Sequence, residues 1–164
     1  MKKIIISYND GPYGSGKAAL AQYVFFKNSI FYSIVKKGKF NKNIRFIKLL
    51  IYLFISILQR FIGVILYQNT QQKKSFNIIN FNLIDLNIFK KNLIIFNWVN
   101  NDTISLDTLI NFNKKSIIYL HDLWFANSAF HHETSFKKNF LNKKIAKYIL
   151  KKKKKVLLKN NYLL

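Results

Sequence analysis

The sequence predicts an α/β fold in which a parallel sheet carries helices on both faces. Short apolar runs typical of buried strands alternate along the chain with segments of helical periodicity. Strands that alternate with helices pair in parallel and are buried on both sides. With 164 residues, half of them apolar, the chain is long enough for one domain with a substantial core.

The predicted strands are short runs rich in isoleucine and phenylalanine, at 3–8, 29–35, 77–83, 92–98 and 116–122. Short helices are expected at 16–28, after a turn at 9–15, and at 103–112. A basic turn follows the second strand. Ligands of parallel sheets bind at the carboxyl ends of the strands, and 9–15, 97–101 and 121–132 all fall there.

A longer helix is predicted at 45–67, where an apolar run from 49 to 58 ends at Gln59 and Arg60. The polar positions of this segment recur at helical spacing and fall within a third of the circumference, which indicates an amphipathic helix with a wide apolar face. Three placements stay open: packing on the sheet, lying in a membrane interface, or spanning a membrane.

The charge of +22 would ordinarily indicate nucleic acid or an anionic membrane, but lysine, asparagine and isoleucine are enriched together, as an A/T-rich coding sequence yields without selection for function. An anionic membrane surface is kept as a candidate partner. Nucleic acid is not expected as the main partner, because only two of the 28 basic residues are arginine. No cysteine is present, which excludes disulfides and thiolate metal sites. No secretory signal precedes the first turn, so we expect a cytoplasmic protein at the inner face of the membrane. We expect a domain at 1–150 and a basic tail at 151–164.

The turn after the first strand resembles a phosphate-binding loop, since Gly11, four residues, Gly16 and Lys17 match most of that signature. The next residue is Ala18, which has no hydroxyl to bind Mg²⁺. A degenerate nucleotide-binding loop is therefore a minor alternative. Without a magnesium ligand, this segment predicts only a glycine-rich turn between a strand and a helix. Such a turn lets a ligand approach backbone amides and the N-terminus of the helix.

The most unusual segment follows the last predicted strand, which delivers His121, Asp122 and Trp124 to its carboxyl end. All three histidines of the chain lie within 121–132. A strand-end histidine bonded to the backbone is the ordinary interpretation of His121 alone. Zinc binding is a formal alternative, but no recognised ligand spacing is present, and no metal or cofactor is expected.

The stretch "SIIYLHDLWFANSAFHH" resembles the "TLHDMW…CHY" stretch of family 4-like glycosyltransferases from exopolysaccharide, colanic-acid-type and capsule pathways. Upstream, "NLIIFNWVNNDTISLDTLINFNKK" is similar to their strand, short loop and "LS" helix. The opening "SGKAALAQY" is similar to their glycine-alanine loop and first helix. These matches occur in order, from residue 2 to about residue 155.

The resemblance implies a Rossmann-like domain, the N-terminal, acceptor-side half of a GT-B glycosyltransferase. This enzyme would transfer a sugar from a nucleotide-sugar to a glycan or lipid-linked acceptor. By matching position, the resemblance implies that His121 is the catalytic residue that would contact the transferring sugar. The donor and diphosphate side is a turn formed by Gly14, Ser15 and Gly16. The acceptor side is formed by Asp122, Trp124 and His131.

The family's C-terminal half, which binds most of the nucleotide-sugar, has no counterpart in the 164 residues. We therefore expect the chain to be inactive alone, with a separately encoded half as partner and 151–164 as a truncation point. The alternatives are a truncated, non-catalytic remnant that still folds and a membrane- or anion-binding module.

Overall fold

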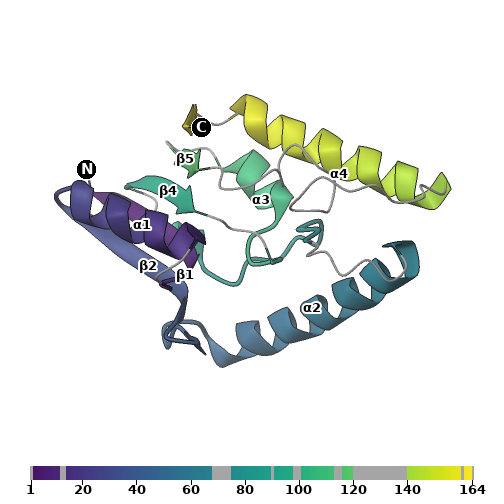
Figure 1. Cartoon of the computed structure of the whole chain (residues 1–164), viewed down its shortest axis with the longest axis horizontal. Coiled ribbons are helices and arrows are strands. Elements are labelled where there is room, and N and C mark those ends of the chain that lie inside the picture. The colour runs from purple at the N-terminus through teal and green to yellow at the C-terminus, as the bar shows by residue number, and fades with distance from the viewer. Residues whose placement is uncertain are drawn as a thin grey trace.

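The computed structural model describes residues 2–11, 14–67, 75–89, 91–97, 101–112, 116–119, 140–159 and 161–163. They form an α/β fold around one sheet, which confirms the predicted class (Figure 1). The sheet has the order β3-β2-β1-β4-β5-β6. Its strands are β1 (Lys3–Asn9), β2 (Ser29–Lys36), β3 (Lys39–Phe40), β4 (Leu93–Asn97), β5 (Ser116–Tyr119) and β6 (Asn161–Leu163). Neighbouring strands are parallel except β3, which pairs antiparallel with β2.

Helices cover both faces of the sheet, and the alternation of side chains along β1 shows how. Ile5 packs beneath Ala19 of helix α1 (Gly14–Phe25) in a small core cluster. Ile4 and Ile6 point to the opposite face and join the main core. That core also receives side chains from the remaining helices, α2 (Phe46–Tyr67), α3 (Leu106–Asn111) and α4 (Phe140–Lys159), and from the 3₁₀ helix η1 (Leu86–Phe89).

Helix α2 lies along one side of the molecule, at the bottom of Figure 1. It contacts the body through one narrow stripe, in which Tyr52, Ile55, Gln59 and Gly63 are buried. Among the described residues, the segment Phe46–Ile65 of this helix is long and apolar enough to cross a membrane, and only 22% of it is buried.

The lysine-rich end of the chain is part of the folded body. Residues 151–155 lie inside α4, so the expected boundary between 150 and 151 falls within a helix. Ile149 and Val156 of this helix are fully buried in the main core. Lys152 forms an ion pair with Asp107 of α3. β6 then pairs with β5, which extends the sheet at that edge.

The strand predicted at 77–83 is wrong. Within that segment the structure contains only an isolated bridge between Asn82 and Ile104. Asn77 has a positive φ of 50°, which an extended strand does not accommodate. Its side chain instead donates to the backbone oxygen of Ile104 over 2.6 Å. The asparagines therefore tie this segment to the chain after β4. The hairpin strand β3 was not predicted.

Candidate functional site

A cavity of about 540 Å³ lies at the carboxyl ends of β1 and β4, beneath α2. The chain runs from β1 to β2 and β3 on one side, then crosses to β4 on the other. Loops at such a switch point diverge, which makes it the usual ligand site of open α/β sheets. α2 contributes most of the walls, and Tyr8 of β1 and the segments at 76 and 101–102 contribute the rest. The lining residues are Tyr8, Tyr52, Ser56, Gln59, Arg60, Gly63, Val64, Phe76, Asn101 and Asp102.

The Asp102 carboxylate is held in place by the segment at 75–77. Its Oδ1 accepts a 2.6 Å hydrogen bond from the backbone N–H of Asn77. Asn101 and Asp102 both have positive φ, 55° and 58°. This conformation is uncommon outside glycine and is retained where the surrounding contacts determine it. The strained turn therefore fixes a carboxylate in the cavity wall.

Burial raises the pKa of Asp102 from 3.8 to about 6. Hydrogen bonds from the backbone of Asn77 and Phe76, and the Gln59 amide, oppose this shift without cancelling it. The carboxyl group therefore changes charge near neutral pH. It can donate a hydrogen bond when protonated and accept several when ionised.

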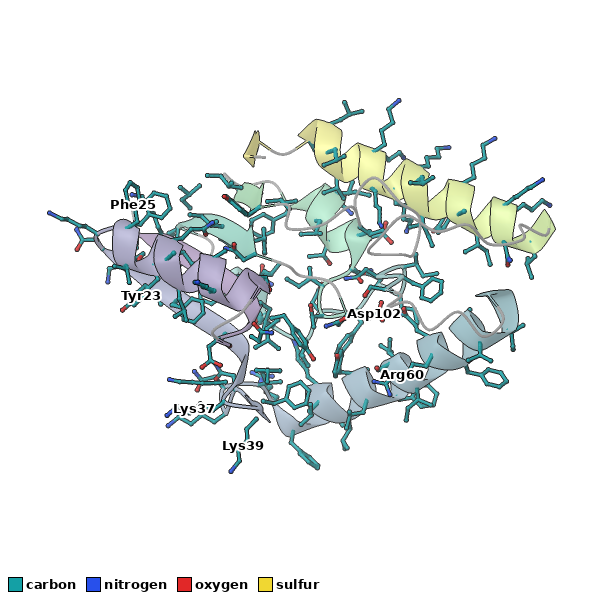
Figure 2. All side chains as sticks on the ribbon, in the orientation of Figure 1. Tyr23, Phe25, Lys37, Lys39, Arg60 and Asp102 are labelled. Atoms are coloured by element: carbon teal, nitrogen blue, oxygen red, sulfur yellow. The ribbon has the colours of Figure 1, made fainter. Side chains whose placement is uncertain are left out.

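Gln59 and Arg60 bring polar groups to the cavity from α2. Gln59 is 4% exposed, and neither its amide oxygen nor its nitrogen makes a hydrogen bond of normal geometry with any described residue, although the amide lies near Asp102. A buried amide with unused hydrogen-bonding capacity is costly unless a ligand or water satisfies it. Figure 2 shows Arg60 on the side of α2 that faces Asp102. These groups make the cavity suited to a polar ligand.

Two tyrosines complete the polar wall. Tyr52 of α2 is 5% exposed, and burial raises the pKa of its hydroxyl well above its ordinary value. The Tyr8 hydroxyl, at the end of β1, hydrogen-bonds to it and raises that pKa further. Tyr52 therefore stays neutral at physiological pH and acts as a hydrogen-bonding group, while Phe76 and Val64 supply apolar contact area.

The residues predicted to form a glycine turn that contacts a diphosphate, Gly14, Ser15 and Gly16, form the first turn of α1 at the same sheet edge, so the helix begins two residues earlier than predicted. A Cβ on Gly16 would overlap Asn9 Oδ1 and would lie 2.6 Å from the backbone oxygen of Gly11, so only glycine fits. Gly14 has a φ of +59°, which also favours glycine. Ser15 is 6% exposed at the start of α1. Its Oγ makes no hydrogen bond with a described residue.

Two more buried side-chain oxygens near the start of α1 make no hydrogen bond with a described residue. They are Ser7 Oγ and Asn9 Oδ1. Ser7 and Asn9 alternate with Tyr8 along β1, so they face α1 while Tyr8 faces the cavity. The turn and the cavity therefore occupy opposite faces of one sheet edge. Lys17 is exposed on α1.

The remaining predicted site residues, His121, Asp122, Trp124 and His131, lie outside the described residues. So does His132, which together with His121, Asp122 and His131 made up the candidate zinc ligands. The described part of the preceding strand, β5, ends at Tyr119, which pairs with Asn97 of β4. The chain therefore leaves β5 at the carboxyl edge of the sheet, beside the strand that leads to Asp102. Among the described residues, no group of three His, Asp or Glu side chains could hold a metal ion.

The cavity itself was not predicted, because its residues come from separate segments that each look ordinary. The signal available in the sequence was the polar stripe of 45–67, where Gln59 and Arg60 interrupt an apolar helix. A second signal was Asn101-Asp102, three and four residues after the end of a predicted strand. Comparisons of the chain with protein-family models, curated proteins and solved structures find no match.

Proposed function

We propose that this chain is the acceptor-side half of a two-domain glycosyltransferase with Rossmann-like topology. Its reaction is sugar transfer from a nucleotide-sugar to a glycan or lipid-linked acceptor in the synthesis of cell-surface polysaccharide, at the inner face of the membrane. The observation that carries this proposal is convergence at one sheet edge. The polar cavity, the Gly14–Gly16 turn and the end of β5, two residues before His121, all lie at the carboxyl ends of β1, β4 and β5.

The composition of the cavity supports a sugar as ligand. A saccharide presents hydroxyls that both donate and accept hydrogen bonds, and its C–H faces need apolar contacts. Asp102, Gln59 and Arg60 offer the polar groups, and Phe76 and Val64 offer apolar ones. The buried Gln59 amide lies beside the Asp102 carboxylate, so a ligand hydroxyl that reaches it adds a hydrogen bond to a polar group shielded from solvent.

The glycine turn supports a neighbouring anionic group. The N-terminus of a twelve-residue helix favours negative charge, and the Ser15 Oγ beside it has no described partner. Glycosyl transfer develops negative charge on the departing diphosphate and positive charge on the sugar ring. In this proposal Gly14, Ser15 and Gly16 face the diphosphate, His121 contacts the transferring sugar, and Asp122, Trp124 and His131 shape the acceptor pocket.

The test is reconstitution of the full chain with a separately produced donor-binding half of a two-domain glycosyltransferase. Transfer of labelled sugar from nucleotide-sugars to a membrane extract is measured. The chain alone is expected to be inactive, because one wall of the cleft cannot position the donor. In the reconstituted enzyme, His121→Ala is expected to lower the rate about 100-fold, which corresponds to about 2.7 kcal/mol.

A matched pair of variants tests the cavity in the same assay. Gln59→Leu keeps the approximate size of a buried cavity side chain but removes its amide, and is expected to raise KM. Asn87→Leu likewise replaces an amide by a hydrocarbon side chain, at an exposed position of η1 outside the cavity, and is expected to leave KM unchanged. Full activity of His121→Ala would remove the proposed catalytic residue. Activity of the chain without a partner would show that the proposed architecture is wrong.

A further inference from the structure

The amphipathic helix α2 is oriented opposite to an ordinary surface helix. Its polar positions Ser56, Gln59 and Arg60 line the cavity, on the side facing the protein. Its other sides expose ten further large apolar side chains: Phe46, Ile47, Leu50, Ile51, Leu53, Phe54, Ile57, Leu58, Phe61 and Ile65. A surface helix of a water-exposed protein turns its apolar stripe inward. This outward apolar face therefore has the arrangement of an interaction surface.

The side chains at the centre of this outward face are largely exposed to solvent. Phe54, Ile57 and Phe61 are 68%, 66% and 63% exposed and follow one another at helical spacing. No acidic residue occurs anywhere in 36–67. The outward face is thus a continuous hydrocarbon surface along the helix, without a carboxylate that would oppose insertion into lipid.

Basic residues surround the beginning of the helix. Lys36, Lys37, Lys39, Lys42 and Arg45 are all exposed. Figure 2 shows Lys37 and Lys39 projecting beside the start of α2. An apolar face bordered by cations complements an anionic bilayer, where lipid headgroups meet the charges and the apolar side chains enter the acyl boundary.

We propose that the outward face of α2 docks the protein on an anionic lipid bilayer, with the helix lying in the plane of the interface. The buried stripe of α2 favours a helix that lies in the membrane interface over a helix that spans the membrane. Tyr52, Ile55, Gln59 and Gly63 attach the helix lengthwise to the body, so a spanning orientation would detach them and expose the Gln59 amide to hydrocarbon. This proposal does not depend on glycosyl transfer.

The experiment is flotation of the full chain with phosphatidylcholine vesicles, with or without phosphatidylglycerol. We expect binding to the anionic vesicles and weakening by high salt. The variant Phe54→Gln/Ile57→Gln/Phe61→Gln removes three outward side chains and is expected to lower affinity about tenfold or more. Lys37→Gln/Lys39→Gln is expected to weaken only the anionic-vesicle binding.

The matched control is Val24→Gln/Phe25→Gln, which replaces side chains that are 80% and 79% exposed on α1. It is expected to leave vesicle binding unchanged, and circular dichroism checks that each variant is folded. Equal binding by the triple variant and the unchanged chain would overturn the proposal. So would a dimer, in place of vesicle binding, that the triple variant abolishes.

Depth of insertion separates lying from spanning. Ile57→Trp places an indole on the outward face, and we expect stronger quenching of its fluorescence by lipids labelled near the headgroup than by lipids labelled at the chain end. The reverse order, together with resistance to carbonate extraction, would show a spanning helix and overturn the proposed orientation.

Discussion

Asn77 and Asp102 bind each other reciprocally. The Asp102 carboxylate accepts from the backbone N–H of Asn77 over 2.6 Å, and the Asn77 side-chain oxygen accepts from the backbone N–H of Asp102 over 3.1 Å. Both residues have positive φ. This pair fastens the segment before η1 to the turn after β4, and it determines where the cavity carboxylate points.

We expect Asn77→Ala to destabilise the protein by about 2–3 kcal/mol, because it removes the bonds to Asp102 and Ile104 and places alanine at positive φ. Urea unfolding measures the loss. Asn77→Gly relieves the backbone strain but not the lost bonds, so it is expected to be only partly destabilising. The exposed Asn87→Ala is the control, and a loss as large there would contradict this account.

The raised pKa of Asp102 makes the free energy of unfolding depend on pH. Its pKa is about 6 when folded, against 3.8 ordinarily. Below the lower value both states are protonated. Between the two values the unfolded chain releases the proton while the folded chain keeps it, so rising pH favours unfolding. The stability lost across this interval is about 3 kcal/mol at about 1.36 kcal/mol per pKa unit.

Asp102→Asn is expected to abolish the pH dependence of stability that the buried carboxyl group causes. Its urea midpoint should change less across the interval than that of the unchanged chain, and the exposed Asp85→Asn, as control, should retain the full pH dependence. A parallel pH profile for Asp102→Asn and the unchanged chain would contradict the assignment.

Replacing two different glycines by alanine distinguishes the loss of stability caused by steric overlap from the loss caused by an unfavourable backbone conformation. Gly16→Ala places a Cβ 2.6 Å and 2.8 Å from backbone atoms of Gly11, so the β1–α1 turn must shift, and we expect a loss of about 3 kcal/mol or more. Gly38 has a φ of +76° and nothing within 4 Å of an added Cβ. Gly38→Ala is therefore expected to cost only about 1 kcal/mol. Equal losses in urea unfolding would show that the turn is not closely packed.

The sequence predicted those elements whose apolar pattern matches their own periodicity. β1, β2, β4 and β5 come from short, largely apolar runs of the sequence, and α2 comes from a segment whose polar positions recur at helical spacing. The failure at 77–83 has a physical cause. Isoleucine and phenylalanine there resemble a strand, but the asparagines bind a segment more than twenty residues away, and local periodicity carries no record of such a contact.

The cavity was missed for a related reason. Tyr8, Gln59 and Asp102 are brought together by sheet order and by the placement of α2. The polar stripe of α2 was recognised, but the sequence left open which way it points. Only the packing of Tyr52 and Ile55 against the body shows that the polar side faces inward. The orientation of an amphipathic helix is a tertiary property.

Helix α2 is one rigid element with two interfaces, since the side that carries Gln59 closes the cavity and the side that carries Phe54 faces outward. Any displacement of the helix at a bilayer therefore moves a cavity wall. By thermodynamic reciprocity, a ligand that favours one position of α2 changes lipid affinity by the same factor that lipid changes ligand affinity. In the proposed docking, occupancy of the cavity and contact with the bilayer would therefore be coupled through the position of this one helix.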